Sequence, residues 1–488
     1  MIAIKRFLFF FILLSLTLPF LHGKYLFFRE TPLVGYFWTS EKPNLKWFTW
    51  KRWLSGSYQE EIRKRTEDHV GFKPTLIRIN NEFDYSLFRI MHAEGFVAGK
   101  NNMLYEEDYI HEYTGDYFIG RRAIDKKLNR LKEVFLHLKS RNIRLVLVFE
   151  PGKASFFPEF INSRFRPEQR TLTNYEYYTW KTKSLGIPFL DLNTYFLQMK
   201  DTSRYPLFPK YGMHWSQYGA FLAVDTLSKF IASQTQKEIP GVQIEKITIS
   251  DLSRGSDYDI GEMMNLCFRL PKTTGAYPSV SFEKDFKGKK LNVLVIADSY
   301  YLNIMETYGR RLFRNEQFWY YNNKLYPYQN FSPPAYISKN NLIDKYSQFD
   351  VILLMTSEIN LHCGFWNFAD EAFRAFHPEV KDDYIYKIEN DIRNERSWFR
   401  FIVRNSKRDR MPLEKAIQVN AEYTFLANYS SLPDKTYWDS VYYLVNSIRS
   451  NHEWMKTVTN KAKERNLSVD SMLVVEAKYS YDQSKQNR

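Results

Sequence analysis

Two hydrophobic periods alternate along the middle of the chain. From Arg121 onward, apolar residues recur at helical spacing, at Ile124, Leu128, Leu131, Val134, Phe135 and Leu138. Short and nearly continuous apolar runs, typical of strands buried on both faces, lie at 144–149, 187–192, 291–297 and 349–355. A second helical pattern spans 218–231. Strands of this kind alternating with helices predict an α/β fold with a mainly parallel sheet between helices.

The flanking segments have other patterns. Two short apolar runs within 96–109 are split by Gly-Lys-Asn-Asn and predict a β-hairpin. A charged helical pattern within 53–74 ends before Gly71. Near the C-terminus, residues 392–423 align without gaps on 448–479, and Trp398 aligns with Trp454. Each copy predicts two helices joined by a turn, and two copies are too few for a solenoid.

The N-terminus carries an export signal. Lys5 and Arg6 precede an apolar run at 7–21, which fits either a cleaved signal peptide or an uncleaved membrane anchor. In both cases the positive-inside rule places the rest of the chain outside the cytoplasm, so we expect a periplasmic protein, tethered to the inner membrane if the leader is retained.

Composition narrows the class of partner. The chain is 44% hydrophobic and 17% aromatic, enough to build a globular core. Its net charge of +14 favours an acidic partner. Export argues against nucleic acid and for a surface polysaccharide, anionic or neutral. Cys267 and Cys363 either pair or remain as two buried thiols.

Candidate chemistry lies where strands end, because ligands of parallel sheets bind at the carboxyl edge. Asp298-Ser299 follows the run at 291–297, and a helix is expected to begin there. His214 lies ahead of Ser216, a plausible N-cap for the next helix. A Ser–His pair is the minimum for an activated oxygen nucleophile. The alternative is that these residues only cap helices or pack.

These blocks resemble the SGNH-hydrolase-like polysaccharide O-acetyltransferases of the alginate O-acetyltransferase type. Ala297-Asp298-Ser299-Tyr300 is similar to the Gly-Asp-Ser block of that family, and His214-Trp215 to its Asp-x-His-Trp block. Further similar segments, in the family's order, are FVAGKNNMLYEEDY at 96–109, VFEPGKASFFPEF at 148–160 and DYDIGEMMNLC at 257–267. The resemblance covers roughly residues 50–370 and implies an SGNH-like, flavodoxin-like fold.

The resemblance implies Ser299 as nucleophile and His214 as base in a Ser–His acyl-enzyme mechanism. It also implies an acyl group supplied by a membrane-bound O-acyltransferase and accepted by a glycan hydroxyl. The family's orienting Asp lies two residues before the His, where this chain has Gly212. A Ser–His dyad, a triad with a relocated acid, or loss of catalysis therefore all remain open. An aspartate introduced at 212 is expected to raise activity if no acid is present, and to be neutral or harmful otherwise.

Other polar residues at the expected sheet edge are weaker candidates. Asp298 adjoins the serine but is expected to point away from the histidine, and Asp191 and Glu150 end other strands. Asn360 is a candidate oxyanion donor and Glu358 a candidate orienting group, although both also suit loop caps. No metal or cofactor motif is evident.

We therefore expect four parts and one main activity. The parts are a leader (1–28), a lead-in segment (29–85), an SGNH-like acyltransferase domain (86–378) and an all-helical appendage (379–488). The expected activity is O-acetylation of an extracytoplasmic polysaccharide. The alternatives are a carbohydrate esterase of the same fold and a non-catalytic glycan-binding or scaffold protein of an export complex.

Overall fold

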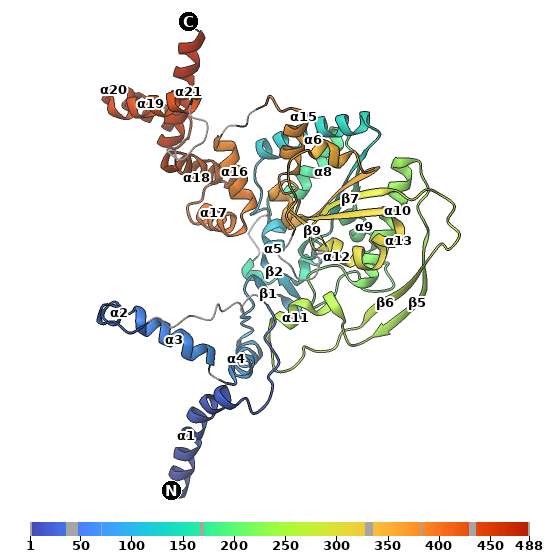
Figure 1. The fold of residues 1–488 in the computed structure, drawn as a ribbon, viewed down its shortest axis with the longest axis vertical. Helices are drawn as coiled ribbons and strands as arrows, with labels where there is room; N and C mark the ends of the chain where they lie inside the picture. Colours follow the sequence, from blue (N-terminus) through green and yellow to red (C-terminus); the bar gives the residue numbers. More distant parts are fainter. Residues whose placement is uncertain are drawn as a thin grey trace.

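A computed structural model describes most of the chain, namely residues 2–35, 47–69, 71–165, 170–326, 335–380, 382, 384–428 and 436–486. Figure 1 shows a central sheet between layers of helices, with the helical N- and C-terminal segments projecting from one side. The α/β architecture predicted from the hydrophobic pattern is confirmed.

The central sheet has six strands in the order β4-β3-β10-β7-β8-β9. All neighbouring pairs are parallel except the last, β8 with β9. The four predicted strands are β3 (Arg144–Glu150), β4 (Phe189–Asp191), β7 (Asn292–Ala297) and β10 (Val351–Ser357). Two strands that the pattern did not single out, β8 (Asn315–Tyr320) and β9 (Lys324–Tyr326), complete it.

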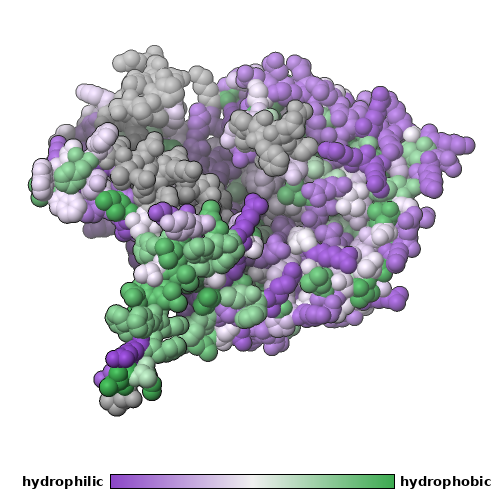
Figure 2. Space-filling view, turned by 60° about the horizontal axis from the view of Figure 1, so that its bottom comes forward, coloured by the Kyte–Doolittle hydropathy of each residue, from purple (hydrophilic) through white to green (hydrophobic). Residues whose placement is uncertain are grey.

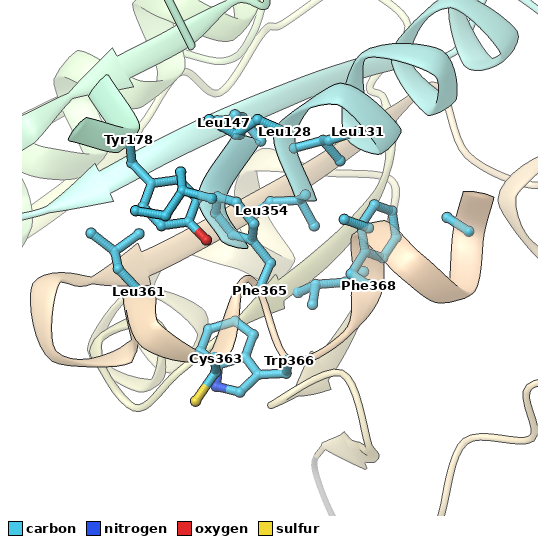
Figure 3. Close-up of a cluster of buried hydrophobic side chains, with 14 of the residues drawn as sticks. Leu128, Leu131, Leu147, Tyr178, Leu354, Leu361, Cys363, Phe365, Trp366 and Phe368 are labelled. Atoms are coloured by element: carbon cyan, nitrogen blue, oxygen red, sulfur yellow. The ribbon is translucent and has the colours of Figure 1, made fainter. Parts of the chain in front are cut away.

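Alternate side chains of the central strands enter two separate cores. Leu147 and Leu354 pack beneath α6 (Arg121–Ser140), α8 (Asn174–Ser184) and α15 (Phe368–Phe376). Figure 3 shows this core, in which Leu128 and Leu131 of α6 meet Phe365 and Phe368. Val148 and Leu353 face the opposite core, beneath α9 (Leu192–Met199), α10 (Gln217–Thr235) and α12 (Tyr300–Ile304). Burial on both faces explains why these strands have nearly continuous apolar runs.

Two small antiparallel pairs lie outside the sheet. β1 (Phe96–Ala98) pairs with β2 (Leu104–Glu106), which confirms the predicted hairpin. β5 (Val242–Ser250) pairs with β6 (Gly275–Phe282), an arm that the pattern did not reveal. The segment between β5 and β6 forms η4 (Gly255–Tyr258) and α11 (Asp259–Met263). The remaining short elements of this region are η1 (Lys100–Asn102), α5 (Glu107–Thr114), α7 (Lys153–Phe156), η2 (Pro158–Phe160), η3 (Ser163–Phe165), η5 (Met305–Gly309, a π-helical turn), α13 (Arg310–Leu312), α14 (Leu342–Tyr346) and η7 (Glu358–Cys363).

In the described part of the chain ahead of the hairpin lie the helices α1 (Ile2–Tyr25), α2 (Trp50–Leu54), α3 (Ser57–His69) and α4 (Lys73–Phe88). α3 confirms the charged helix expected before Gly71. Among the described residues, α1 is the one helix long and apolar enough to cross a membrane. Figure 2 shows that its surface is predominantly hydrophobic.

The C-terminal helices are α16 (Tyr384–Asn394), α17 (Arg396–Arg408), α18 (Leu413–Asn428), α19 (Thr436–Ser450), α20 (His452–Glu464) and α21 (Val469–Gln486). Each of the two aligned segments holds two helices, α17 and α18 in the first copy and α20 and α21 in the second. The turns between these helices contain Arg410 and Asn466 at equivalent positions, with φ of 52° and 51°. Trp398 and Trp454 are both half-buried, but they contact different cores. The first copy packs on the α6 side of the sheet, and the second builds a core of its own.

Candidate active site

Ser299 lies where β7 ends and a helical segment begins. It occupies the N-cap position of α12, which continues through the π-helical turn and α13 as far as Leu312. β3, β10 and β7 are parallel neighbours, so Glu150, Ser357 and Ala297 end at the same edge of the sheet. This is the edge at which ligands of open α/β sheets bind.

The loop before α10 brings His214 to this edge. Ser216 caps α10 by accepting a hydrogen bond from the Gly219 amide, as the sequence suggested. Trp215 is fully buried, and its ring meets those of Phe196 and Tyr300. The tryptophan thus anchors the loop in the core, while the neighbouring histidine keeps 13% of its side-chain surface exposed. His214 Nε2 lies 2.8 Å from the hydroxyl oxygen of Ser299.

Asp259 is the acid beside the histidine. Its Oδ2 lies 3.2 Å from His214 Nδ1, and its Oδ1 accepts the backbone N–H of Met213 at 3.0 Å. With Nδ1 protonated and donating to Asp259, Nε2 is free to accept the Ser299 proton. Asp259 lies within the segment 257–267 that resembles the family, but it was not among the predicted site residues. Of the three alternatives left open, the geometry matches a triad with a relocated acid.

The space beside Gly212, where a longer side chain would lie, is already occupied by neighbouring residues. A Cβ added there would meet the Ser256 carbonyl oxygen at 2.2 Å and Pro209 Cγ at 2.8 Å. The backbone of the η4 segment therefore lies directly against Gly212. This close approach allows the acid to reach His214 from a separate segment instead of from two residues upstream.

Lys153 holds the backbone of the loop that carries His214. It is buried, and its Nζ donates to the carbonyl oxygens of Lys210 at 3.0 Å and Gly212 at 2.6 Å. Burial lowers the pKa of Lys153 to about 7. The lysine comes from the Pro-Gly-Lys turn after β3, so the end of one strand fixes the loop that carries the histidine.

Asp298 points away from His214, as expected, and fixes the turn that holds Ser299. Its Oδ1 accepts the Tyr300 amide at 3.0 Å. Its Oδ2 accepts from the amide of Ser357 at 2.9 Å and from the hydroxyl of the same residue at 2.6 Å. Asn360 adds a third donor to Oδ2 through Nδ2 at 2.8 Å. This carboxylate links the ends of β7 and β10.

Asn360 was predicted as a candidate oxyanion donor, and the structure places it beside this turn. Its Nδ2 donates to Asp298 and also to the Ser357 hydroxyl, at 3.1 Å. Asp298 Oδ2 and the Ser357 hydroxyl oxygen lie 2.6 Å from each other, too close for the two hydrogens of one amide to point separately at them, so one hydrogen serves both. Asn360 lines the pocket together with Ser299, and its role as an oxyanion donor stays a prediction.

The other predicted acids lie apart from His214. Glu358 is buried and accepts from Ser155 at 2.5 Å and from Asn193, so it does not orient the histidine. Asp191 caps α9 by accepting the Thr194 amide. Glu150 is fully buried, and burial together with the nearby Asp298 carboxylate raises its pKa well above the usual value.

A pocket of about 540 Å³ opens over Ser299 and His214. Its wall includes Asn394 and Arg396 at the junction of α16 and α17, so the first C-terminal repeat contributes to the site. Arg396 bonds Asp108 at 2.7 Å and also Glu106, and its side chain remains more than half exposed. Lys339 in the same pocket pairs with Glu371 at 2.9 Å. The repeat pattern in the sequence predicted pairs of helices but not their contribution to a pocket.

The cysteines do not pair. Both are free, Cys267 exposed and Cys363 buried, so both alternatives drawn from the sequence were wrong for Cys267. Within the described ranges, no cluster of three or more His, Cys, Asp or Glu side chains is arranged to hold a metal ion.

Several solved structures are distantly similar to this chain. The O-acetyltransferase domain of Pseudomonas putida AlgJ is 15% identical, with a TM-score of 0.37, covering 55% of this chain and 92% of that domain. Bacillus cereus PatB1 is 14% identical, with a TM-score of 0.34, over 51% of this chain and 92% of that one. Pseudomonas aeruginosa AlgX is 11% identical, with a TM-score of 0.37, over 57% and 66%. TM-scores of this size are too low to support an assignment of family or function. The search of curated protein sequences found no match.

The family comparison is more specific. Residues 96–266 match the model of the SGNH hydrolase-like domain of acetyltransferase AlgX. The match includes Lys153, His214 and Asp259, whereas Ser299 lies beyond it. Over residues 96–266, this chain is therefore similar to the AlgX-type SGNH hydrolase-like acetyltransferase domains.

Proposed function

We propose that the protein is an O-acetyltransferase that modifies an extracytoplasmic polysaccharide through an acyl-enzyme on Ser299. The observation that carries the proposal is the continuous hydrogen-bonded chain from Ser299 through His214 to Asp259. Its order of nucleophile, base and orienting acid is the one that activates a serine for acyl transfer. The AlgX-type family match supports the same reaction class.

In the first half-reaction, the Ser299 oxygen attacks the carbonyl carbon of an acetyl donor while His214 Nε2 takes the hydroxyl proton. The resulting imidazolium is stabilised by Asp259, which stays ionised. The backbone N–H of Ser299, at the N-cap of α12, is the donor that we expect for the oxyanion. Collapse of the tetrahedral intermediate expels the donor's leaving group, which receives the proton from His214.

In the second half-reaction, a sugar hydroxyl enters the pocket and gives its proton to His214 Nε2. The sugar oxygen attacks the Ser299 ester, and the proton returns to Ser299 when the acetyl group leaves. Polar side chains on the pocket wall, Arg396 and Lys339 among them, suit a hydroxyl-rich acceptor. Water as acceptor would give an esterase, which has identical chemistry up to the acyl-enzyme.

The site is expected to work outside the cytoplasm. The apolar α1 with Lys5 and Arg6 ahead of its core supports export, as signal peptide or anchor. In that compartment the acyl group is expected to come from a membrane-bound O-acyltransferase partner, and the acceptor to be a glycan in transit.

Acetyl transfer to an oligosaccharide tests the proposal. Purified full chain is incubated with 4-nitrophenyl acetate and acetyl-free oligosaccharides of several charge classes, and glycan mass is followed. We expect acetylated glycan from the wild type, none from Ser299→Ala, and full transfer from Ser347→Ala, whose hydroxyl lies on an exposed turn. Ester hydrolysis without glycan acetylation would instead identify an esterase, and transfer that survives Ser299→Ala would contradict the proposal.

A further inference from the structure

Helix α4 has one face fixed to the catalytic loops. Asn81 is buried and donates from Nδ2 to the backbone carbonyls of Met264 and Asn265. Tyr85, one turn further, belongs to a small core with Tyr211 and Tyr258. Those tyrosines come from the two segments that supply His214 and Asp259. The position of α4 is therefore coupled directly to the base and the acid.

The opposite face of α4 is an exposed apolar stripe. Its members recur every three or four residues, and their side chains are between 49% and 61% exposed; they are Leu76, Ile79, Phe83 and Leu87. At 100° per residue these four positions lie on the far side of the helix from Asn81 and Tyr85. Single exposed leucines are ordinary, but a continuous stripe on one helix marks a surface that is covered in use.

The end of α1 is built into the start of α4. The Gly71 amide donates to the Pro19 carbonyl at 2.9 Å, and the buried ring of His22 stacks on Phe72 with centroids 4.2 Å apart. Glu30, just after α1, accepts from the Thr75 hydroxyl at 2.6 Å. The apolar α1 thus leaves the molecule beside the stripe. Figure 2 shows hydrophobic surface running from α1 onto the adjoining part of the molecule.

Neighbouring residues have the character of a bilayer interface. Leu26, Phe27 and Phe28 directly follow α1 and are exposed. On the same side of the molecule (Figure 1), α2 exposes Trp50, Trp53 and Lys51, whereas Arg52 is half-buried in an ion pair with Glu61. Tryptophan and basic side chains are enriched where proteins meet lipid headgroups, which favours lipid over a protein partner as the occupant of this surface.

We propose that the α4 stripe lies in the interfacial layer of the membrane that α1 enters. α1 then acts as an uncleaved anchor, and α4 as an amphipathic helix lying in the membrane plane. Because its other face holds the His214 and Asp259 segments, α4 sets the catalytic pocket at a fixed position over the bilayer. The inference rests on the retained anchor form of the proposed export, and not on the acetyl-transfer chemistry.

Contact of single residues with lipid can be measured in the full chain by fluorescence quenching. In a Cys267→Ser background, an environment-sensitive fluorophore is attached at Leu87→Cys, at Leu13→Cys within α1, or at Leu136→Cys on α6. Leu136 is the matched control, an exposed leucine on a helix of the α/β domain. The protein is reconstituted in nanodiscs with and without spin-labelled lipid. We expect quenching by spin-labelled lipid at positions 13 and 87 and none at position 136.

Quenching at 13 without quenching at 87 overturns the proposal, and so does absence of quenching at both. Protection of position 87 from aqueous iodide without quenching by lipid would indicate a protein partner and also overturns it. In a second variant, Ile79→Glu with Phe83→Glu, the label at 87 should lose most of its lipid quenching. Turnover of a soluble acetyl ester should stay unchanged, which separates failure of this inference from failure of the proposed function.

Discussion

His214 Nδ1 lies 3.2 Å from Oδ2 of Asp259, a residue that follows it by 45 positions and comes from a different segment. The tertiary structure therefore places the acid beside the histidine, and the two residues do not have the local Asp-x-His spacing. Asp259 also accepts the Met213 amide, so one carboxylate fixes both the ring and the backbone beside it.

Replacing Asp259 with Asn should remove most of the turnover while the protein stays folded. The amide is nearly isosteric, but it favours the wrong histidine tautomer, a change that costs about 10⁴-fold in a serine protease. Hydrolysis of 4-nitrophenyl acetate gives kcat, and circular dichroism checks the fold. Asp257→Asn is the control, because Asp257 is buried with a pKa raised to about 7 by burial, and it should lose little activity below that pH. Equal losses in the two variants would contradict the role of Asp259.

An aspartate at 212 should lower activity, contrary to the gain that an empty acid position would produce. Even a Cβ at this site meets the Ser256 carbonyl oxygen at 2.2 Å, so the loop carrying His214 must move. We expect Gly212→Ala and Gly212→Asp both to reduce kcat and lower Tm. Gly241→Ala, where the nearest atom to the new Cβ is 3.8 Å away, should behave as wild type. Increased activity of Gly212→Asp would contradict the close packing of the loop against position 212.

Removing the Arg396 side chain should impair the reaction with the glycan more than the reaction with the acetyl donor. It lines the pocket from α17 with a side chain that is more than half exposed. Asp108 keeps a second partner, Arg400 at 2.7 Å, when Arg396 is removed. Arg396→Ala is expected to raise KM for the oligosaccharide several-fold and to leave hydrolysis of a small ester nearly unchanged. Arg408→Ala, at the other end of α17, is the control. A parallel loss in both reactions would assign Arg396 to structure alone.

The free energy of unfolding should fall as the pH rises, because the buried Glu358 carboxyl loses its proton. Burial raises its pKa to about 7 from the usual 4.5, so the folded state holds a proton that the unfolded state has released between these values. The resulting stabilisation is complete below about pH 4.5 and is lost as the pH rises through about 7. Glu358→Gln should flatten this part of the Tm-against-pH curve, measured by differential scanning calorimetry. An unchanged slope would show that Glu358 is not the group responsible.

The sheet and the Ser–His pair could be predicted because they depend on local signals. β3, β7 and β10 are buried on both faces, which produces continuous apolar runs, and Ser299 follows one of them directly. Asp259 lies between β5 and β6, where these signals are weak. A register shift between Ile244 and Lys246 breaks the alternation in β5, and Pro278 within β6 argues against a strand. The place of Arg396 in the pocket depends on packing between distant segments, which no local pattern reports.

The most direct test of the central claim is detection of the acyl-enzyme. The wild type is mixed with 4-nitrophenyl acetate without glycan, quenched in acid, digested and analysed by mass spectrometry. The acetyl group should be found on the peptide containing Ser299 and should move to the glycan when an acceptor is added before the quench. Ser299→Ala should carry no acetyl at this peptide, and His214→Ala should acquire it far more slowly. Acetylated glycan formed by a protein that never carries acetyl on Ser299 would contradict the account.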